Sequence, residues 1–256
     1  MKKHQKRIAA PRSRRIERKT AYWTVKPRPG PHPGDRSVPL LLLVRDVLKL
    51  ADNSREAKRV LNEGNIVVNG RVRKDHKFPV GVFDVLSIPV LKTNYIALLD
   101  DKGKLSLVKM TEEEASRKLC RVNDKRMLKE GTIQLNLHDG RNILPGEKLG
   151  EQIKTHDSLL ISLPDNKILQ HFAYKEGSKA MVIGGKHSAQ TGEIEAIRTV
   201  RGPESNVVKI KPAAANGDAD TGSFETIDDY VFVVGEERIE IPKVNYRHRL
   251  TQINAD

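Results

Sequence analysis

The sequence predicts an α+β protein that consists of several small modules. Its 256 residues exceed the usual length of one domain, about 100 to 200 residues. Basic residues are concentrated in a proline-rich N-terminal segment, and after residue 40 a helical hydrophobic pattern gives way to short strand-like runs. We expect a basic extended N-terminal arm, a small helix-helix-hairpin module, a β-rich central domain and a small barrel-like β module. The expected ranges are 1–36, 37–92, 93–174 and 175–240, followed by a C-terminal tail at 241–256.

The N-terminal arm carries most of the net charge. The chain has 46 Lys and Arg against 33 Asp and Glu, which gives a net charge of +13. Residues 1–36 hold twelve bases and two acids, so the rest of the chain has a net charge of only +3. Five prolines in the arm favour extended backbone. We expect the arm to become ordered on a polyanionic partner, with a solubilising tail as the alternative, and Tyr22 and Trp23 to dock it onto the body or the partner.

Cysteine content and hydropathy favour a cytosolic protein. The one cysteine, Cys120, excludes an internal disulfide framework and a Cys-rich zinc site, and we expect it to be a small buried hydrophobe. No apolar run exceeds that from Leu40 to Val44, which is too short to span a membrane, and the basic N-terminus lacks the apolar segment of a signal peptide. With only eleven aromatic residues, recognition of phosphates and shape is favoured over stacking of bases.

The helix-helix-hairpin module is predicted from spacing and turn chemistry. Apolar residues at helical spacing between Leu40 and Ala51 predict the first helix. Asn53, with Glu56 three residues later, predicts the start of a second helix, which Gly64 ends. The run 66–68, the turn pair Asn69-Gly70 and the basic run 71–74 predict a hairpin. Bases occupy most of the solvent-facing positions, which favours an RNA-binding surface over an ordinary solvated face.

The remaining body has a strand-like pattern. We expect strands near 95–99, 105–109, 132–137 and 158–163, interrupted by a helix that Thr111 caps and that continues through Leu119. In the last module, strands at 180–183, 192–197 and 207–210 accompany a basic turn at 184–187, and a final strand pair is expected within 224–234. The basic turn could meet a phosphate or could be an ordinary hairpin turn with incidental charge.

We find no pattern of catalytic or metal-binding residues. Gly185-Lys186 departs from the phosphate-binding P-loop, because Ala180 stands at the first glycine position and His187 at the Ser/Thr position. The eight histidines have no metal-ligand spacing on one helix. Neighbouring carboxylates, such as Asp100-Asp101 and Asp228-Asp229, fall in predicted turns, where aspartate serves the backbone geometry. We therefore expect no enzyme, no cofactor, no metal and no small-molecule substrate.

Several segments resemble the small-subunit ribosomal protein four family of archaea and eukaryotes, the "e" type. Taken in chain order, these segments are 3–11, 29–32, 69–73, 78–81, 114–115, 118–120, 138–141, 181–185 and 230–235. The resemblance implies a basic N-terminal region, an RNA-binding module over Leu40 to about Ile88, a family-specific central domain and a small KOW-type β-barrel. Because the chain stops soon after Arg249, without a longer basic ending, we expect an archaeal member.

The resemblance, together with the charge pattern, gives a set of expected RNA-binding residues. They are Lys2, Lys3, Lys6, Arg7, Arg12, Arg14 and Arg15 in the arm, Arg45, Lys49, Arg55, Lys58, Arg59, Arg71, Arg73 and Lys74 in the module, and Lys186 and His187 at the basic turn.

We hypothesise a non-catalytic, structural constituent of the small ribosomal subunit that binds folded ribosomal RNA and supports subunit assembly and translation. Its expected partners are small-subunit ribosomal RNA and neighbouring ribosomal proteins, and its expected place is the cytoplasmic ribosome. Two alternatives are a transcription or RNA-processing factor, since KOW-type barrels also occur in elongation factors, and an RNA-modifying enzyme that carries the same module. The second alternative would need a catalytic domain, for which the balanced central region leaves little room.

Overall fold

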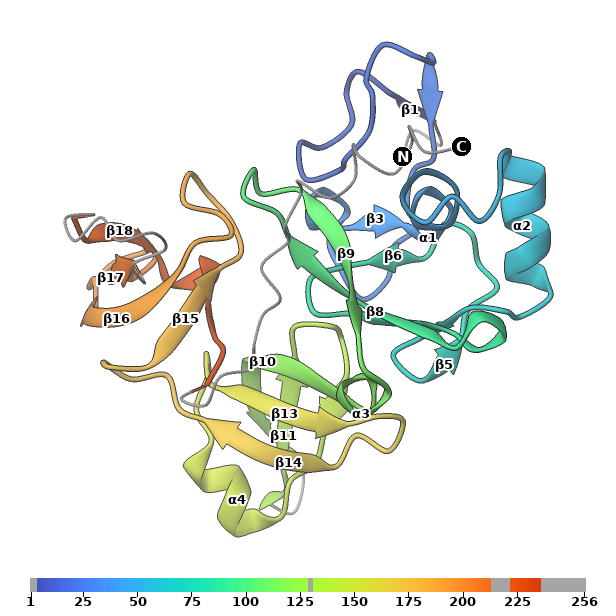
Figure 1. The fold of residues 1–256 in the computed structure, drawn as a ribbon. Helices are drawn as coiled ribbons and strands as arrows, with labels where there is room; N and C mark the ends of the chain where they lie inside the picture. The colour runs from blue at the N-terminus through green and yellow to red at the C-terminus, as the bar shows by residue number, and fades with distance from the viewer. Residues whose placement is uncertain (1–3, 129–130, 213–221, 236–256) are drawn as a thin grey trace.

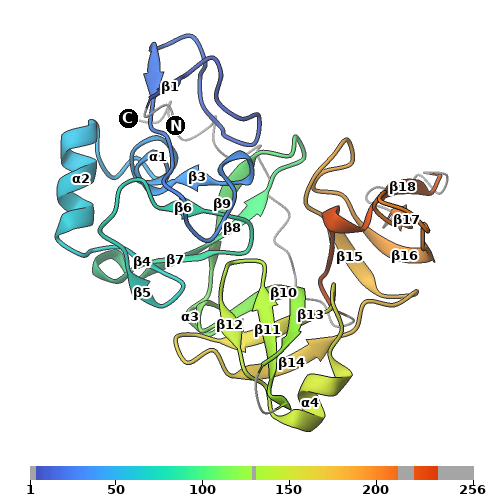
Figure 2. The same ribbon diagram turned by 180° about the vertical axis from the view of Figure 1, so that it is seen from behind.

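The computed structural model describes residues 4–128, 131–212 and 222–235, and within them it contains three five-stranded antiparallel sheets and an N-terminal arm (Figure 1). Seen from behind, the central sheet lies below the first sheet and the C-terminal sheet lies to one side (Figure 2). Strands predominate and the helices are short, in agreement with the expected α+β class. Among the described residues, no helix has the length and apolar character needed to cross a membrane.

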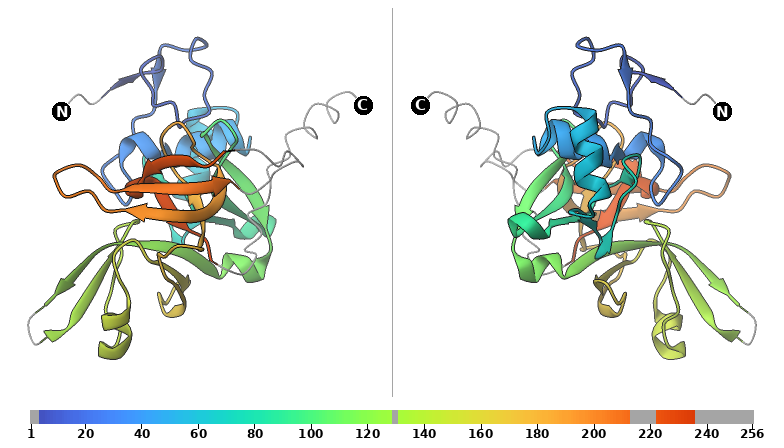
Figure 3. Two further views of the ribbon diagram at one scale, coloured as in Figure 1. Left: turned by 90° about the vertical axis from the view of Figure 1, so that its left-hand side faces the viewer. Right: turned by 90° about the vertical axis from the view of Figure 1, so that its right-hand side faces the viewer.

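The arm folds back on itself and is less extended than expected. Its strands β1 (Gln5–Lys6) and β2 (Trp23–Thr24) pair antiparallel, and Figure 3 shows this part projecting from the body. The 3₁₀ helix η1 (Gly34–Arg36) then leads into β3 (Val38–Pro39), which pairs with β6 (Pro79–Val80). The arm is therefore joined to the body by backbone hydrogen bonds.

The first predicted helix is shorter than its hydrophobic pattern indicates. It begins as α1 (Leu40–Leu42) and continues as the π-helical turn η2 (Leu43–Val47), where the amide of Leu48 donates to the carbonyl of Leu43. Lys49 has a left-handed φ of 53°, which ends the helical path before Ala51. The apolar residues of α1 are all buried, so packing on every side replaces the expected single stripe.

The second helix and the hairpin are confirmed. The helix α2 (Ser54–Asn62) begins after Asn53, whose side chain accepts hydrogen bonds from the amides of Arg55 and Glu56. At the turn between β4 (Val67–Val68) and β5 (Arg71–Val72), Asn69 and Gly70 have φ of 52° and 75°, the positive values that an Asn-Gly turn provides.

The first sheet extends well beyond this hairpin. Its strand order is β5-β4-β7-β8-β9, and the 3₁₀ helix η3 (Pro89–Leu91) connects β7 with β8. The added strands are β7 (Val85–Ile88), β8 (Thr93–Leu99) and β9 (Leu105–Met110). The expected domain boundary at residues 92 and 93 therefore falls between two hydrogen-bonded strands of one sheet.

The central sheet has the strand order β12-β11-β10-β13-β14. Its members are β10 (Arg117–Met127), β11 (Ile133–Leu137), β12 (Asn142–Ile143), β13 (Ser158–Ser162) and β14 (Ile168–Phe172), with α4 (Glu147–Gln152) before β13. The helix predicted from Thr111 through Leu119 is wrong in length. The helix α3 covers only Glu112–Ala115, because the chain from Arg117 onward pairs with β13, although the predicted capping box is present.

The C-terminal sheet confirms the three predicted strands of the last module. Its order is β18-β17-β16-β15-β19, with β15 (Lys179–Val182), β16 (Thr191–Arg198), β17 (Val207–Pro212), β18 (Phe224–Ile227) and β19 (Val231–Val233). The two final strands predicted within 224–234 are present, but they do not pair with each other, because the 3₁₀ helix η5 (Asp228–Tyr230) carries the chain from one edge of the sheet to the other. The expected C-terminal tail lies outside the described residues.

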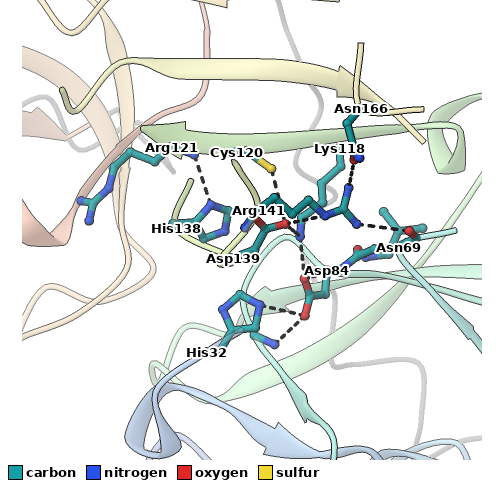
Figure 4. Close-up of polar contacts among 12 residues, drawn as sticks. His32, Asn69, Asp84, Lys118, Cys120, Arg121, His138, Asp139, Arg141 and Asn166 are labelled. Carbon is teal, nitrogen blue, oxygen red and sulfur yellow. Dashed lines mark hydrogen bonds and ion pairs between the residues drawn. The ribbon is translucent and has the colours of Figure 1, made fainter. Parts of the chain in front are cut away.

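A buried ion cluster joins the first sheet to the central sheet (Figure 4). The side chain of Lys118, on β10, is fully buried, and its Nζ lies 2.7 Å from a carboxylate oxygen of Asp84 and 2.7 Å from one of Asp139. Arg141 adds a second cation, with its Nε 3.2 Å from the same Asp139 oxygen. Two carboxylates thus face two cations inside the protein.

Every carboxylate oxygen of Asp84 has a partner. Oδ1 accepts from Lys118 and from the side-chain amide of Asn69, and Oδ2 accepts from the backbone amide of Gly81. His32 of the arm places its Nε2 2.9 Å from Oδ2. The His32 ring lies so close to Gly81 that a Cβ there would be 2.4 Å from it, so only glycine leaves room for this contact.

The charges of the cluster stabilise one another. Burial alone would lower the pKa of Lys118, but Asp84 and Asp139 outweigh that effect and raise it. Burial would also raise the pKa of Asp84, and Lys118 and then His32 hold it well below its ordinary value. The cluster is therefore charged in the folded protein, and loss of one member would leave a buried charge with fewer partners.

Arg121 links the central sheet to the C-terminal sheet in a similar way. Its guanidinium donates to the backbone carbonyls of Asp229, at 2.8 Å, and Val231, at 3.1 Å. Phe83 of the first sheet contacts Phe232 with ring centroids 4.4 Å apart, within a hydrophobic core that both sheets share. The three sheets are therefore held together by both polar and apolar contacts.

The first prediction concerns Lys118. We expect Lys118→Met to lower the free energy of unfolding by about 3 to 5 kcal/mol, because Asp84 and Asp139 lose a buried partner. Urea denaturation of the purified protein measures this change. Lys109→Met, at an exposed position on β9, is the matched control and should change the stability little. A loss for Lys118→Met below about 1 kcal/mol, the size expected of an exposed pair, would contradict the role of the cluster.

The second prediction concerns pH. Burial, and then Lys118, lower the pKa of His138 to about 3, so the folded protein keeps this ring neutral where the unfolded chain protonates it. Stability should therefore fall as the pH drops from 7 to 5, by at most about 1.4 kcal/mol per pH unit for this one proton. His138→Asn keeps an acceptor for the amide of Arg121 and should make the slope shallower.

The slope should not disappear in that variant, because burial also lowers the pKa of His76 and of His156. Chemical denaturation at several pH values provides the measurement. His4→Asn, at an exposed position, is the control and should keep the wild-type slope. Identical slopes for His138→Asn and the wild type would show that the ring is already accessible to protons in the folded state.

Candidate nucleic-acid interface

The arm exposes some of its expected RNA-binding residues and buries one. Lys6, Arg12 and Arg15 are exposed, whereas Lys2 and Lys3 lie outside the described residues. Arg7 is half-buried, and its guanidinium donates to the carbonyl of Glu17. The arm therefore combines bases that face solvent with bases that hold its own loops together.

Arg14 was expected to contact RNA, but its side chain is buried. It is only 2% exposed, and its guanidinium donates to the carbonyls of Ser37, at 3.1 Å, and Gly34, at 2.9 Å. It also donates to the side chain of Gln5 at 3.0 Å. Burial lowers its pKa to about 10, which Asp35 partly opposes. Since its donors are used inside the arm, Arg14 positions the arm and has no surface left for a phosphate.

The helix α2 presents a basic outer face. Ala57 and Leu61 are buried against the body, and Arg55, Lys58 and Arg59 are exposed on the outer side. Lys49, before the helix, is exposed as well. Helical spacing thus separates the apolar residues from the bases, as the sequence predicts.

Two of the bases on or near α2 have carboxylate partners. Arg45 is half-buried and contacts Asp46, with Nε 2.6 Å from the carboxylate, and it also donates to the hydroxyl of Ser54. The hydrogen bond with Asp46 raises the pKa of Arg45. Arg59 lies 3.1 Å from Glu63 in an exposed pair four residues apart on the helix.

The hairpin continues the basic surface of α2. Arg71 and Lys74 are exposed, and the Lys74 side chain passes near Gly64 at the end of α2. Arg73 is half-buried, and its guanidinium lies 4.5 Å from the ring centroid of Phe78. Burial, followed by the repulsion of Arg71, lowers the pKa of Arg73. The hairpin bases and the α2 bases therefore belong to one region of the fold.

The basic turn of the C-terminal sheet lies apart from this region (Figure 1). Lys186 is exposed, whereas His187 is half-buried and stacks on Phe224 with ring centroids 4.2 Å apart. Its Nδ1 lies 3.1 Å from the side-chain oxygen of Gln190. The stacking gives His187 a packing role in addition to any contact with a partner.

One group of side chains has the elements of a metal site. Ligand atoms of Cys120, His138 and Asp139 all lie within 4.8 Å of one another. However, the Asp139 carboxylate already faces Lys118 and Arg141, and burial raises the pKa of the Cys120 thiol, which opposes the thiolate that a metal needs (Figure 4). The donor set therefore does not fit a cation, and Cys120 is the buried small residue that the sequence predicts.

Sequence reasoning did not identify the ion cluster. The sequence His138-Asp139-Gly140 is typical of a turn, and Asp139 does accept from the amide of Arg141. Yet it also pairs with Lys118, which lies 21 residues away. Aspartate in a turn and lysine in a strand are common, so the sequence holds no local signal of this pairing.

Three family models match successive parts of the chain. Residues 1–35 match the RS4NT (NUC023) domain, residues 42–86 match the S4 domain, and residues 91–168 match the ribosomal family S4e. The S4 match covers η2, α2 and the hairpin, which carry the basic surface, and only the last residue of α1.

Similar proteins extend along most of the chain. The small ribosomal subunit protein eS4 of Methanocella arvoryzae is 44% identical over 234 residues, 91% of this chain and 94% of that protein. That of Archaeoglobus fulgidus is 41% identical over 242 residues, 94% of this chain and 97% of that protein. The crystal structure of the 30S ribosomal protein S4e from Thermoplasma acidophilum is 39% identical and has a TM-score of 0.65, covering 78% of this chain and 96% of that one. On this evidence the chain belongs to the eS4 family, whose members are structural proteins of the small ribosomal subunit and not enzymes.

Proposed function

We propose that this protein is a structural constituent of the small ribosomal subunit in the cytoplasm and binds folded ribosomal RNA there. The observation that supports this most directly is the basic outer face of α2, which continues onto the hairpin and lies on a buried apolar base. Lysine and arginine at such a surface neutralise phosphates and release counterions. The helix and hairpin supply a rigid surface that recognises RNA by its shape.

The arm and the module have different tasks in this proposal. Exposed arm bases add affinity that does not depend on sequence, whereas the module positions the protein on one folded RNA. The remaining proposed contacts are Lys186 and His187, at the turn of a C-terminal sheet that we propose to be a KOW-type module. Neighbouring ribosomal proteins are the other partners in this proposal.

The third prediction tests the arm. Arg12 and Lys19 are exposed, so replacing both with glutamine should leave folding intact and reduce the salt dependence of RNA binding. Each lost phosphate contact lowers the slope of log K against log salt by about 1. Filter binding to small-subunit ribosomal RNA at several salt concentrations gives the slope. The double variant Lys109→Gln and Lys167→Gln removes the same charge from exposed positions outside the arm and should keep the slope.

Equal slopes for the arm variant and the wild type would contradict the proposed role of these bases. A reduced slope for the control pair as well would mean that net charge, and not its place in the arm, governs the affinity.

The fourth prediction tests α2. Arg59→Glu should weaken binding to small-subunit ribosomal RNA more than binding to an unrelated RNA of equal length, because this helix positions the protein. The exposed pair with Glu63 contributes only about 0.3 to 0.5 kcal/mol, so folding should persist. Competition binding of the two RNAs measures the ratio of affinities, and Lys109→Glu is the control. Equal losses for both RNAs would argue against α2 as the positioning surface.

A further inference from the structure

A groove lies between the arm and the helical module. It has a volume of about 220 Å³, and its walls include His4 and Trp23 from the arm, Lys58 from α2, and His76 and Lys77 from the segment that follows the hairpin. The two sides of the groove therefore come from parts of the chain that are more than 30 residues apart. Of the proposed RNA contacts, Lys58 lines this groove.

The arm side of the groove is aromatic and exposed. Trp23 is 54% exposed and its neighbour Tyr22 is 62% exposed. Their rings meet edge to face with centroids 4.7 Å apart, and the ring of His4 lies 5.7 Å from that of Trp23. Tyr22 and Trp23 were expected to dock the arm onto the body or a partner. Rings that dock against the body would be largely buried, and these two are not.

The module side of the groove is positively charged. Burial lowers the pKa of His76, and the nearby Lys58, Lys77 and Arg28 lower it further, with Asp75 as the opposing acid. These cations are therefore close enough to His76 to repel a proton from it. A bound anion would relieve that repulsion.

The two sides of the groove differ in chemistry. The arm contributes an aromatic surface, and the module contributes a cluster of cations.

We propose that this groove binds one unpaired nucleotide of RNA, with its base stacked on Trp23 and its phosphate held by Lys58 and Lys77. The volume is below the roughly 300 to 1,000 Å³ of pockets for drug-sized ligands, and it suits a single base and its phosphate. This site deepens the proposed function, because it rests on the binding of ribosomal RNA and adds the kind of nucleotide that is bound. The low aromatic content of the chain disfavours base stacking in general, but this proposal assigns one stacking contact to Trp23.

Trp23 is the only tryptophan of the chain, so its fluorescence reports on the groove directly. The probe is a single-stranded hexauridylate, titrated into the full-length protein at low salt. We expect it to quench the fluorescence, whereas a blunt RNA duplex with the same number of phosphates should quench it much less. Removal of an aromatic ring that stacks on a base commonly weakens binding about tenfold or more. Trp23→Leu should therefore weaken hexauridylate binding by about tenfold. The anisotropy of a labelled oligonucleotide measures this affinity.

The cation side needs a separate variant. Lys58→Gln combined with Lys77→Gln should weaken quenching by hexauridylate and lower its salt slope by up to about 2. The control pair Lys109→Gln and Lys167→Gln should leave the quenching unchanged. In the wild type, NMR titration should show that hexauridylate raises the pKa of His76, since the bound phosphate favours the charged ring.

The outcomes separate this site from the proposed function. If hexauridylate leaves Trp23 fluorescence unchanged while small-subunit ribosomal RNA still binds to the filter, the nucleotide site is wrong and the proposed function stands. If neither RNA binds, both are wrong. Equal quenching by the duplex or by polyglutamate would overturn the site, because the groove would then attract any polyanion or acidic peptide without selecting an unpaired base.

Discussion

The buried ammonium of Lys118 is the interaction on which the arrangement of the modules depends. It contacts one carboxylate in the first sheet, that of Asp84, and one in the turn after β11, that of Asp139, both at 2.7 Å. If either carboxylate moved away, Lys118 would lose one of its two anionic partners inside the protein, which is more costly than breaking an exposed pair. The contact therefore fixes the first sheet, and the basic helix attached to it, relative to the central sheet.

The arm is tied to the same constraint. His32 reaches Asp84 from the arm, and Arg14 donates to the carbonyls of Gly34 and Ser37 before β3 and to the side chain of Gln5 on β1. The exposed bases and the aromatic pair of the arm are consequently carried on a folded support. An arm of this kind presents its phosphate contacts and its stacking surface in a set position, which lowers the entropy that RNA binding has to overcome.

Local sequence signals predicted the elements that local chemistry decides. Asn53 and the pair Asn69-Gly70 gave the start of α2 and the hairpin turn, because capping and positive φ are properties of a few neighbouring residues. The end of α3 was missed, because β10 gains its partner strand from about 40 residues further along the chain. The basic face of α2 was predicted from helical spacing, but Arg14 could not be distinguished from its exposed neighbours, because charge alone does not tell which base finds carbonyls to bind. The ion cluster was missed as well, because Lys118 lies 34 residues from Asp84 and 21 residues from Asp139 in the sequence.

Burial also changes how the net charge of the protein should be understood. In the described part of the body, five aspartates are buried, namely Asp84, Asp100, Asp139, Asp157 and Asp228, against only two bases, Lys118 and Arg121. These acids serve internal contacts; Asp100, for example, accepts from the amides of Lys102 and Lys104. Because the interior takes up more acids than bases, the exposed side chains are more positive than the near-neutral composition of the body indicates. The same network that orients the modules thus leaves a more basic surface, which suits the RNA partner that we propose.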